Sequence, residues 1–381
     1  MAALAAFGAQ AQSSVTLSGN LDFAYANVGG TQLLAKGSTI STGAGTASTS
    51  VINIRAVEDL GAGLKATAHY GLDPRALAND SLAVTNNNPA AAAQSAPTNT
   101  TTGLARDEAF VGIEGAFGNI RLGAPNSIGL NTFQVASPAG TGVGSGYTGG
   151  GTAATMTNSF VQTRYSRSIR WDSPVMAGFT ASYLMAPGND QTYYAASGVS
   201  TALLIPNARK GTEFGLRYAN GPLTVAFANV AQTEQANAAG WYSAAAYSAT
   251  TSLKKTSVNL LNASYTLGNT TVYAGWNDGD RLAGFAATDG AAVKSKGSRY
   301  AIKHTMGAID LMATVTNQTA NSGTSGAEVK AKVTGFRADY NLSKTAAAYI
   351  GYEKFDTGTA YSNSLTTGDR TITSAGLKKS F

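Results

Sequence analysis

Hydrophobic and polar residues alternate one by one along much of the chain. In the stretch LKATAHYGLD (residues 64–73), the side chains of Leu64, Ala68 and Tyr70 share one face, while Lys65 and His69 share the other. A period of two is typical of a β-strand whose two faces meet different surroundings. The pattern predicts sixteen strands, at about residues 15–28, 48–59, 62–73, 105–115, 118–125, 161–173, 177–188, 210–220, 222–233, 254–267, 269–278, 296–306, 308–318, 329–341, 344–356 and 370–381.

The links between these segments are alternately short and long. Short links such as Asn220–Gly221 and Leu267–Gly268 supply the positive φ angle of a tight hairpin turn. The long links are polar and rich in Gly, Ala, Asn and Thr, and the third of them covers residues 126–160. Strands of about ten residues, joined by short turns at one rim and long loops at the other, are typical of an antiparallel transmembrane β-barrel. A soluble sandwich or propeller would space its turns more evenly.

The alternation continues to the end of the chain, where Ala375, Leu377 and Phe381 fall on one parity. In a barrel the apolar row faces lipid, because hydrocarbon offers polar groups no partner, and the polar row lines a wet interior. The last strand must also pair with the first to remove the open sheet edges. Phe381 is therefore predicted to face outward at the periplasmic interface and to complete barrel closure.

The amino-acid composition excludes several kinds of functional site. Charged residues make up 13% of the 381, no run approaches the ~18–20 apolar residues of a membrane-spanning helix, and there are no cysteines. Disulfide frameworks, thiolate metal sites and cysteine nucleophiles are thereby excluded. The net charge of +6 comes from scattered basic residues, which argues against a nucleic-acid partner.

The first eleven residues, MAALAAFGAQA, combine a small apolar run with an Ala-x-Ala ending. This combination predicts the remnant of a secretory signal peptide, and an Ala-rich disordered terminus is the alternative. Residues 12–381 then form a single β-barrel domain.

Several motifs resemble matching stretches of the Gram-negative general porins. They are IRAVEDLGAGLKA (54–66), EAFVGIEGAFGNIRLG (108–123), RYSRSIRWDSPVMAGFTASY (164–183), RADYNLSKTAAAYIGY (337–352) and AGLKKSF (375–381). The resemblance implies a sixteen-stranded antiparallel transmembrane β-barrel in the bacterial outer membrane, with the third long loop (126–160) folded into the lumen. It also implies a homotrimer in contact with outer-membrane lipid and lipopolysaccharide, and a C-terminal aromatic similar to the signal read by the barrel-assembly machinery.

The match to the family's pore-lining positions is incomplete. Arg164 and Arg170 coincide with basic positions of the sixth strand. Val51, Asp107 and Ala124 stand where family members often carry a basic residue. The resemblance therefore predicts the fold, but it does not identify the residues at the constriction.

Parity predicts which charged side chains line the lumen. The predicted pore-lining set is Arg55, Lys65, Arg106, Glu108, Arg121, Arg164 and Arg170, and the same parity adds Arg217, Arg299, Lys303, Arg337 and Lys378 with Asp22, Glu213, Asp310 and Asp339. Residues 126–160 contain no Asp, Glu, Lys or Arg. A basic wall facing an uncharged loop predicts a weak-to-moderate preference for small anionic or neutral solutes. The alternative is that several arginines pair with Glu58, Asp59 or Glu108 and brace the barrel.

The sequence gives little support for an enzymatic function. The two histidines, His69 and His304, have no bracketing Ser or Asp motif of the kind that nucleophilic catalysis requires. GSGYTG (144–149) matches a phosphate-binding pattern by chance, since no helix is expected after it. No metal or cofactor is predicted. The leading function is passive diffusion of small hydrophilic solutes, and the alternatives are a closed-lumen surface receptor or adhesin barrel and a soluble secreted β-protein.

Overall fold

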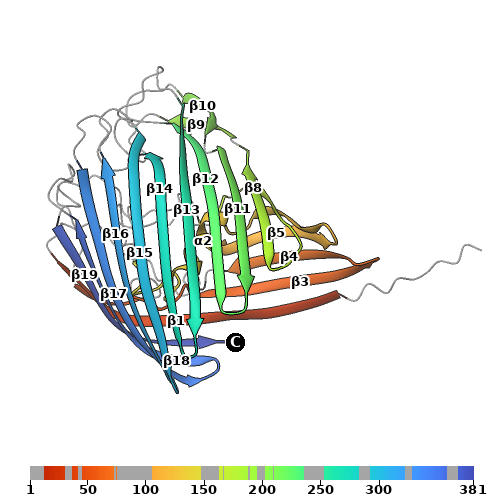
Figure 1. Ribbon diagram of the computed structural model, residues 1–381. Helices are drawn as coiled ribbons and strands as arrows, with labels where there is room; N and C mark the ends of the chain where they lie inside the picture. Colours follow the sequence, from red (N-terminus) through yellow and green to blue (C-terminus); the bar gives the residue numbers. More distant parts are fainter. Residues whose placement is uncertain are drawn as a thin grey trace, which may run out of the picture.

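The chain forms one closed β-barrel in the computed structural model (Figure 1). The structure describes residues 13–30, 37–41, 45–72, 74, 105–146, 163–165, 167–187, 189–194, 202–208, 210–235, 253–282, 292–321, 328–357 and 368–381. The predicted signal remnant at 1–11 and the second part of the third loop, 147–160, lie outside these residues.

All sixteen predicted strands are present, each paired antiparallel with its neighbours. They are β1 (Ser13–Gly30), β3 (Val51–Gly61), β4 (Leu64–Leu72), β5 (Ala105–Gly115), β6 (Gly118–Ala124), β7 (Ser168–Asp172), β8 (Phe179–Ala186), β11 (Lys210–Asn220), β12 (Leu223–Gln235), β13 (Leu253–Leu267), β14 (Thr270–Leu282), β15 (Ala292–Met306), β16 (Ile309–Asn321), β17 (Glu328–Ser343), β18 (Ala346–Thr357) and β19 (Gly368–Ser380). The tight turn between β11 and β12 consists of Gly221 and Pro222, one residue later than predicted, with φ 54° at the glycine. The sixth strand is shorter than predicted, because β7 begins at Ser168 rather than near residue 161.

The second strand is interrupted, which the alternation did not predict. β2 (Gly37–Ser41) pairs with the C-terminal part of β1, at residues 24–28. β3 pairs with the N-terminal part of the same strand, at residues 13–20. The two pieces therefore occupy one position in the wall, so the seventeen strands of the sheet make sixteen wall positions. Residues 45–50 lie between the pieces, and five of the six, all except Thr49, are buried or half-buried.

The barrel closes through the last residue of the chain. β19 pairs with β1 from Ser380, opposite Asn20, to Arg370, opposite Gly30. Phe381 adds two backbone hydrogen bonds of 3.0 Å with Gly19, one in each direction. The predicted closure is confirmed, and the Phe381 side chain is half exposed.

The two faces of the wall follow the predicted parity. Val111, Ile350 and Leu377 are more than half exposed on the outside. Their inward neighbours include Tyr349, which is 4% exposed, and Gly112, which is buried. Large apolar side chains therefore cover the outer surface, while the buried side chains face the lumen.

Two elements stand apart from the wall. β9 (Asn189–Tyr194) and β10 (Ala202–Ala208) form a separate hairpin between β8 and β11. The helix α2 (Ile128–Val135) lies inside the barrel, against β11, β12 and β13 (Figure 1). Among the described residues, no helix has the length and the apolar character needed to cross a membrane.

Candidate functional site

A segment of the third long loop crosses the lumen from one wall toward the other. Residues 126–146, which we call the constriction segment, begin after β6 and contain α2. Ser127 caps the helix, since its Oγ accepts a hydrogen bond of 2.9 Å from the Leu130 backbone N–H. The buried side chains of Ile128, Leu130 and Phe133 hold the helix against the wall. The described part of this loop, as far as residue 146, lies against the inner faces of β11, β12 and β13 through α2.

Carboxylates of the wall fix the start of the constriction segment. The Glu213 side chain, fully buried, accepts a 2.9 Å hydrogen bond from the Gly129 N–H and a 3.0 Å bond from the Tyr165 hydroxyl. The Glu108 side chain accepts a 2.7 Å bond from the Asn126 N–H. Negative charge beside the first turn of a helix also complements the helix dipole. The helix start is thereby held by groups that the wall supplies.

Polar groups fix the rest of the segment in the same way. The Asn262 amide donates to the Thr132 carbonyl at 2.7 Å. The Glu353 carboxylate, 1% exposed, accepts bonds from the Gly144 and Gly146 N–H groups at 3.1 and 2.9 Å. The wall comes so close here that a Cβ on Gly335 would lie 2.3 Å from the Gly144 carbonyl oxygen. Glu353 and Asn262 therefore hold the segment through its backbone groups.

Residues 45–50 add a second inserted segment. Ser48 donates to the Asp22 carboxylate from its backbone N–H at 2.7 Å and from its hydroxyl at 2.9 Å, and the Tyr349 hydroxyl donates to the same carboxylate. The Thr46 carbonyl accepts a 2.8 Å bond from the Val143 N–H. The two inserted segments therefore touch each other inside the lumen. The sequence analysis placed residues 48–50 in a strand, and this assignment was wrong.

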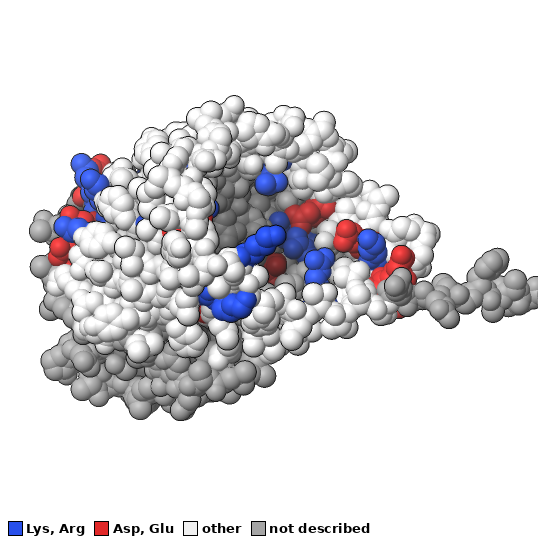
Figure 2. All heavy atoms as spheres, turned by 90° about the horizontal axis from the view of Figure 1, so that it is seen from below, with Lys and Arg blue, Asp and Glu red and all other residues white. Residues whose placement is uncertain are grey.

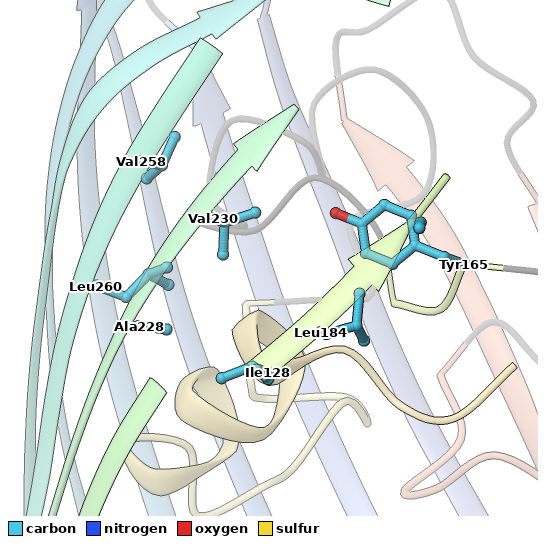
Figure 3. Close-up of a cluster of buried hydrophobic side chains, with 8 residues drawn as sticks. Ile128, Tyr165, Leu184, Ala228, Val230, Val258 and Leu260 are labelled. Atoms are coloured by element: carbon cyan, nitrogen blue, oxygen red, sulfur yellow. The ribbon is translucent and has the colours of Figure 1, made fainter. Parts of the chain in front are cut away.

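A cluster of apolar side chains packs between α2 and the strands β8, β12 and β13. It consists of Ile128, Tyr165, Leu184, Ala186, Ala228, Val230, Val258 and Leu260. Figure 3 shows Leu184 of β8, Ala228 and Val230 of β12, and Val258 and Leu260 of β13, together with Ile128 on α2 and Tyr165 from the segment before β7. The inward face of these strands is apolar only where the helix covers it, so this part of the lumen is packed rather than wet.

Two arginines of the predicted pore-lining set, Arg121 and Arg164, form ion pairs with carboxylates. Arg121 forms an ion pair with Asp172 and lies 3.6 Å from Glu108, and Arg164 forms an ion pair with Asp107. The pairing with Glu108 confirms one of the bracing contacts that the sequence left open.

Arg170 serves both the wall and the constriction segment. Its guanidinium contacts Asp172 at 2.8 Å and donates to the Asn126 carbonyl and the Asn131 side chain at 2.6 and 2.5 Å. The basic wall is therefore partly neutralised by carboxylates of the neighbouring strands.

The other members of the predicted set lie around this wall. Arg55 is exposed on β3, opposite His69 of β4. Lys65 is exposed on β4, between Asp59 of β3 and Glu114 of β5. Arg106 belongs to β5, and its side chain lies outside the described part of the structure.

A cavity of about 640 Å³ lies between α2 and the inner face of the barrel wall. Its basic lining residues are Arg121, Arg170, Arg217 and Lys303, and its acidic lining residue is Asp172. Asn131, Gln134 and Ser137 of the constriction segment close the opposite side. Figure 2 shows the hollow at this end of the molecule, with basic and acidic side chains around it. The described lining of this cavity therefore carries more basic than acidic groups.

Arg217 differs from the other arginines of this cavity. It lies on the inward parity of β11, below the buried Glu213 and Gly215, and its side chain is exposed. No ion pair is found for it among the described residues. Lys303, by contrast, lies 3.1 Å from Asp310. Arg217 therefore presents its full charge to the open lumen.

The pairing of two acidic residues, Asp107 and Asp172, with arginines was not predicted from the sequence, for different reasons. Asp107 reaches Arg164 because the pairing of β4 and β5 shifts register between Tyr70 and Leu72, which breaks the simple alternation. Asp172 needed no such irregularity. It follows Arg170 by two residues on the same strand face, so its parity alone could have identified it.

The two histidines take part in local hydrogen bonds. His69 Nε2 lies 3.1 Å from the Asn53 amide oxygen, and its ring is 5.5 Å from that of Phe110. His304 Nδ1 lies 2.8 Å from the Thr270 hydroxyl beside a short turn. Within the described part of the chain, no group of three His, Cys, Asp or Glu side chains could hold a metal ion.

Comparisons with known proteins agree with this geometry. A family model described as Gram-negative porin matches residues 1–360. No curated protein sequence matches the chain.

Among solved structures, an anion-selective porin from Comamonas acidovorans is similar with a TM-score of 0.68 at 20% identity, covering 97% of this chain and 100% of that one. The trimer form of OmpT, an outer membrane protein of Vibrio cholerae, gives 0.63 at 12% identity, with 97% and 99% covered. OmpF of Salmonella typhi, in complex with daunomycin, gives 0.61 at 14% identity, with 96% and 97% covered.

Proposed function

The chain belongs to the Gram-negative porin family, and from that premise we propose that its pore passes small anions more readily than cations. As a porin it resides in the outer membrane and forms a water-filled channel through which small hydrophilic solutes diffuse passively. The proposal concerns which solutes pass, and it needs no chemical step and no cofactor.

The charge of the open cavity carries the proposal. Its described lining holds four basic side chains, Arg121, Arg170, Arg217 and Lys303, against the single carboxylate of Asp172. The constriction segment opposite adds amide and hydroxyl groups but no charge. Low-dielectric walls focus the potential of fixed charges into the space between them. Anions are therefore enriched in the pore, and cations are depleted.

Ion pairing sets the strength of this preference. Arg121 and Arg170 share Asp172, and Lys303 lies beside Asp310. Each pair leaves little net field at a distance, because the two charges cancel beyond a few ångströms. Arg217 is then the largest contributor among the described groups, with Arg55 and Lys65 as further exposed cations. The resulting preference is weak to moderate.

The open lumen also favours a channel over a closed-lumen surface receptor. A receptor barrel would fill its interior with bulky side chains, whereas this barrel keeps a cavity of about 640 Å³ below the constriction segment. Packed regions are found around Ile128 and Leu260 and, beside the second inserted segment, around Val143 and Tyr349.

The proposal extends to the assembly. The trimer form of the similar Vibrio cholerae protein supports a homotrimer. The exposed apolar outer face supports contact with outer-membrane lipid and lipopolysaccharide. The pairing of Phe381 with Gly19 at the end of the chain supports delivery by the barrel-assembly machinery through the C-terminal strand.

Bilayer recording together with liposome swelling tests the proposal. Purified protein should insert into a planar bilayer in discrete conductance steps. Liposomes that contain it should swell faster in a sugar acid than in a positively charged amino sugar of equal size, with the neutral sugar in between. Conductance without discrimination would refute the anion preference, and absence of conductance would favour the receptor.

A further inference from the structure

A group of lysines lies on the outer face of the wall, near the rim that carries the long links. Lys296 of β15 and Lys330 and Lys332 of β17, which we call the basic patch, are exposed on the outward parity of their strands. β16 runs between these two strands (Figure 1). On its outward face, Thr319 stands opposite both Lys296 and Lys330. Asn317 stands opposite Lys332. Three ammonium groups therefore surround one uncharged strip of β16.

The charge of the basic patch is only partly matched. Lys330 forms an exposed ion pair of 3.0 Å with Glu328. Neither Lys296 nor Lys332 has an ion pair among the described residues. Positive charge therefore exceeds negative charge over β16, where an anionic group can approach the lysines from outside the barrel.

Carboxylates border the basic patch on both sides. Asp278 of β14 stands opposite Lys296, and Asp356 of β18 stands opposite Lys332. Each carboxylate lies on the side of its lysine that faces away from β16. Divalent cations are commonly held between protein carboxylates and the phosphates of a ligand. These borders therefore suit a phosphorylated ligand that arrives with divalent counter-ions.

An apolar groove of about 680 Å³ lies on the same outer face, nearer the middle of the wall. Ala313, Ala338 and Ala375 contribute to its lining. Larger side chains stand beside these alanines, and those of Phe336 and Ile350 are more than half exposed. The small residues thus leave a hollow between projecting neighbours. On a face that meets lipid, a hollow with this lining fits a hydrocarbon chain.

The groove and the basic patch are spaced like the two ends of a lipid. Phe336 in the groove and Lys332 in the basic patch are four residues apart on β17, which is about 13 Å along a strand. Half of a barrel's apolar band, itself about 25 Å tall, has the same size. Tyr300 lies between the two levels and packs edge-on against Trp276, with ring centroids 6.1 Å apart. Aromatic side chains mark the membrane interface in this way. A lipid chain in the groove therefore brings its head group to the lysines.

We propose that this face binds one molecule of lipopolysaccharide, with a phosphate of its lipid A over β16 among the three lysines and an acyl chain in the groove. The position of the basic patch selects this lipid over a glycerophospholipid of the inner leaflet. β15 and β16 are joined by the short turn at Gly307 and Ala308, so the lysines lie toward the opposite rim, which outer-membrane barrels expose to the outside. The inference rests on the proposed contact with lipopolysaccharide and is independent of the ion preference of the pore.

Binding of purified lipid A to the detergent-solubilised protein tests the site, with native mass spectrometry counting the lipids on each chain. The wild type should hold one diphosphorylated lipid A per chain and bind dephosphorylated lipid A and phosphatidylglycerol several-fold more weakly. Lys296→Gln combined with Lys332→Gln should raise the Kd roughly 25-fold, because each lysine beside a lipid phosphate contributes about fivefold. Arg167→Gln combined with Lys210→Gln is the matched control, since it removes two exposed cations near the same rim at β7 and β11.

Equal binding by the wild type and the double lysine variant overturns the proposal, as does equal binding of dephosphorylated lipid A. Phosphatidylglycerol that binds as tightly as lipid A overturns the choice of lipopolysaccharide.

Ala313→Phe tests the groove separately, because it fills the hollow and keeps every lysine. It should weaken the binding of lipid A several-fold, whereas Ala263→Phe, on the outward parity of β13 and outside the groove lining, should not. Unchanged binding in a folded Ala313→Phe protein would contradict the role of the groove. Conductance of the same preparations in a bilayer without lipopolysaccharide reports on the pore alone. Normal conductance without lipid A binding would therefore refute the lipid site and leave the channel function standing.

Discussion

Arg121 forms its ion pair with Asp172, the residue diagonally across the β6–β7 pair, while Asp172 also binds Arg170. One carboxylate therefore serves two arginines of the predicted pore wall. The arrangement keeps both guanidinium groups in place at the cavity, and Glu108, 3.6 Å from Arg121, supplies a second carboxylate beside them. Selectivity in this pore thus depends on acidic neighbours as much as on the arginines.

Replacement of Asp172 by Asn should increase the anion preference. The side chain keeps its size, but Arg121 and Arg170 lose their shared counter-charge. A unit charge about 7 Å from a passing ion in water contributes roughly 0.6 kcal/mol, which corresponds to a factor of about three. The lost charge acts in opposite senses on an anion and on a cation, so the ratio of anion to cation permeability should rise several-fold, by up to about eightfold, as measured by the zero-current potential. Asp278→Asn is the matched control, because it removes an equal charge from the outward parity of β14.

Replacement of Arg217 by Gln should have the opposite effect. This arginine is exposed in the cavity and has no ion pair among the described residues, so its charge acts on the permeant ions directly. The permeability ratio should fall by a similar amount, several-fold and up to about eightfold. Arg167→Gln also lowers the net charge by one but lies outside the cavity lining, and it should leave the ratio unchanged. Equal effects of both variants would mean that total charge, rather than the cavity, sets the preference.

Loss of Glu213 should loosen the constriction segment. Glu213→Ala leaves the Gly129 N–H and the Tyr165 hydroxyl without their acceptor. Hydrogen bonds to charged groups contribute roughly 1.5–3 kcal/mol each, so the start of α2 should detach from the wall part of the time. Single channels should become noisier and more conductive. Tyr165→Phe removes one of the two bonds and should give an intermediate effect, whereas quiet channels in both variants would contradict the role of this contact.

Removal of Phe381 should impair barrel closure. The residue contributes the last two backbone hydrogen bonds between the final and first strands, both to Gly19. A chain that ends at Ser380 should yield less folded protein, as judged by the shift in gel mobility between heated and unheated samples. Phe381→Tyr keeps the backbone and an aromatic ring and should fold normally. Equal folding yields from all three proteins would show that closure does not need this residue.

The wall of the barrel could be predicted from the sequence because one physical signal repeats along it. Each strand separates lipid from the lumen, so alternation, turn chemistry and parity all point to the same register. Even the pairing of Phe381 followed from the need to remove an open edge. The interior could not be predicted as well, because it depends on contacts between residues far apart in the sequence.

Three interior features illustrate this limit. The helix α2 is only eight residues long, and its apolar side chains match a wall that the helix sequence does not reveal. The inserted residues 45–50 are held by Asp22 and Tyr349, which lie near opposite ends of the chain. The bulge that turns Asp107 toward Arg164 changes parity within a strand that otherwise alternates. Pairing of the arginines was accordingly left open by the sequence and is visible only in the structure.

We propose that the pore favours anions because Arg217 and the partly neutralised arginines outweigh the carboxylate in the described lining of the cavity. The zero-current potential of purified protein in a planar bilayer, under a KCl gradient, tests it most directly. We expect a potential of the sign that chloride permeation produces, modest in size and reduced in Arg217→Gln. A potential of the sign that potassium produces would leave the porin fold intact and contradict the account of its charge.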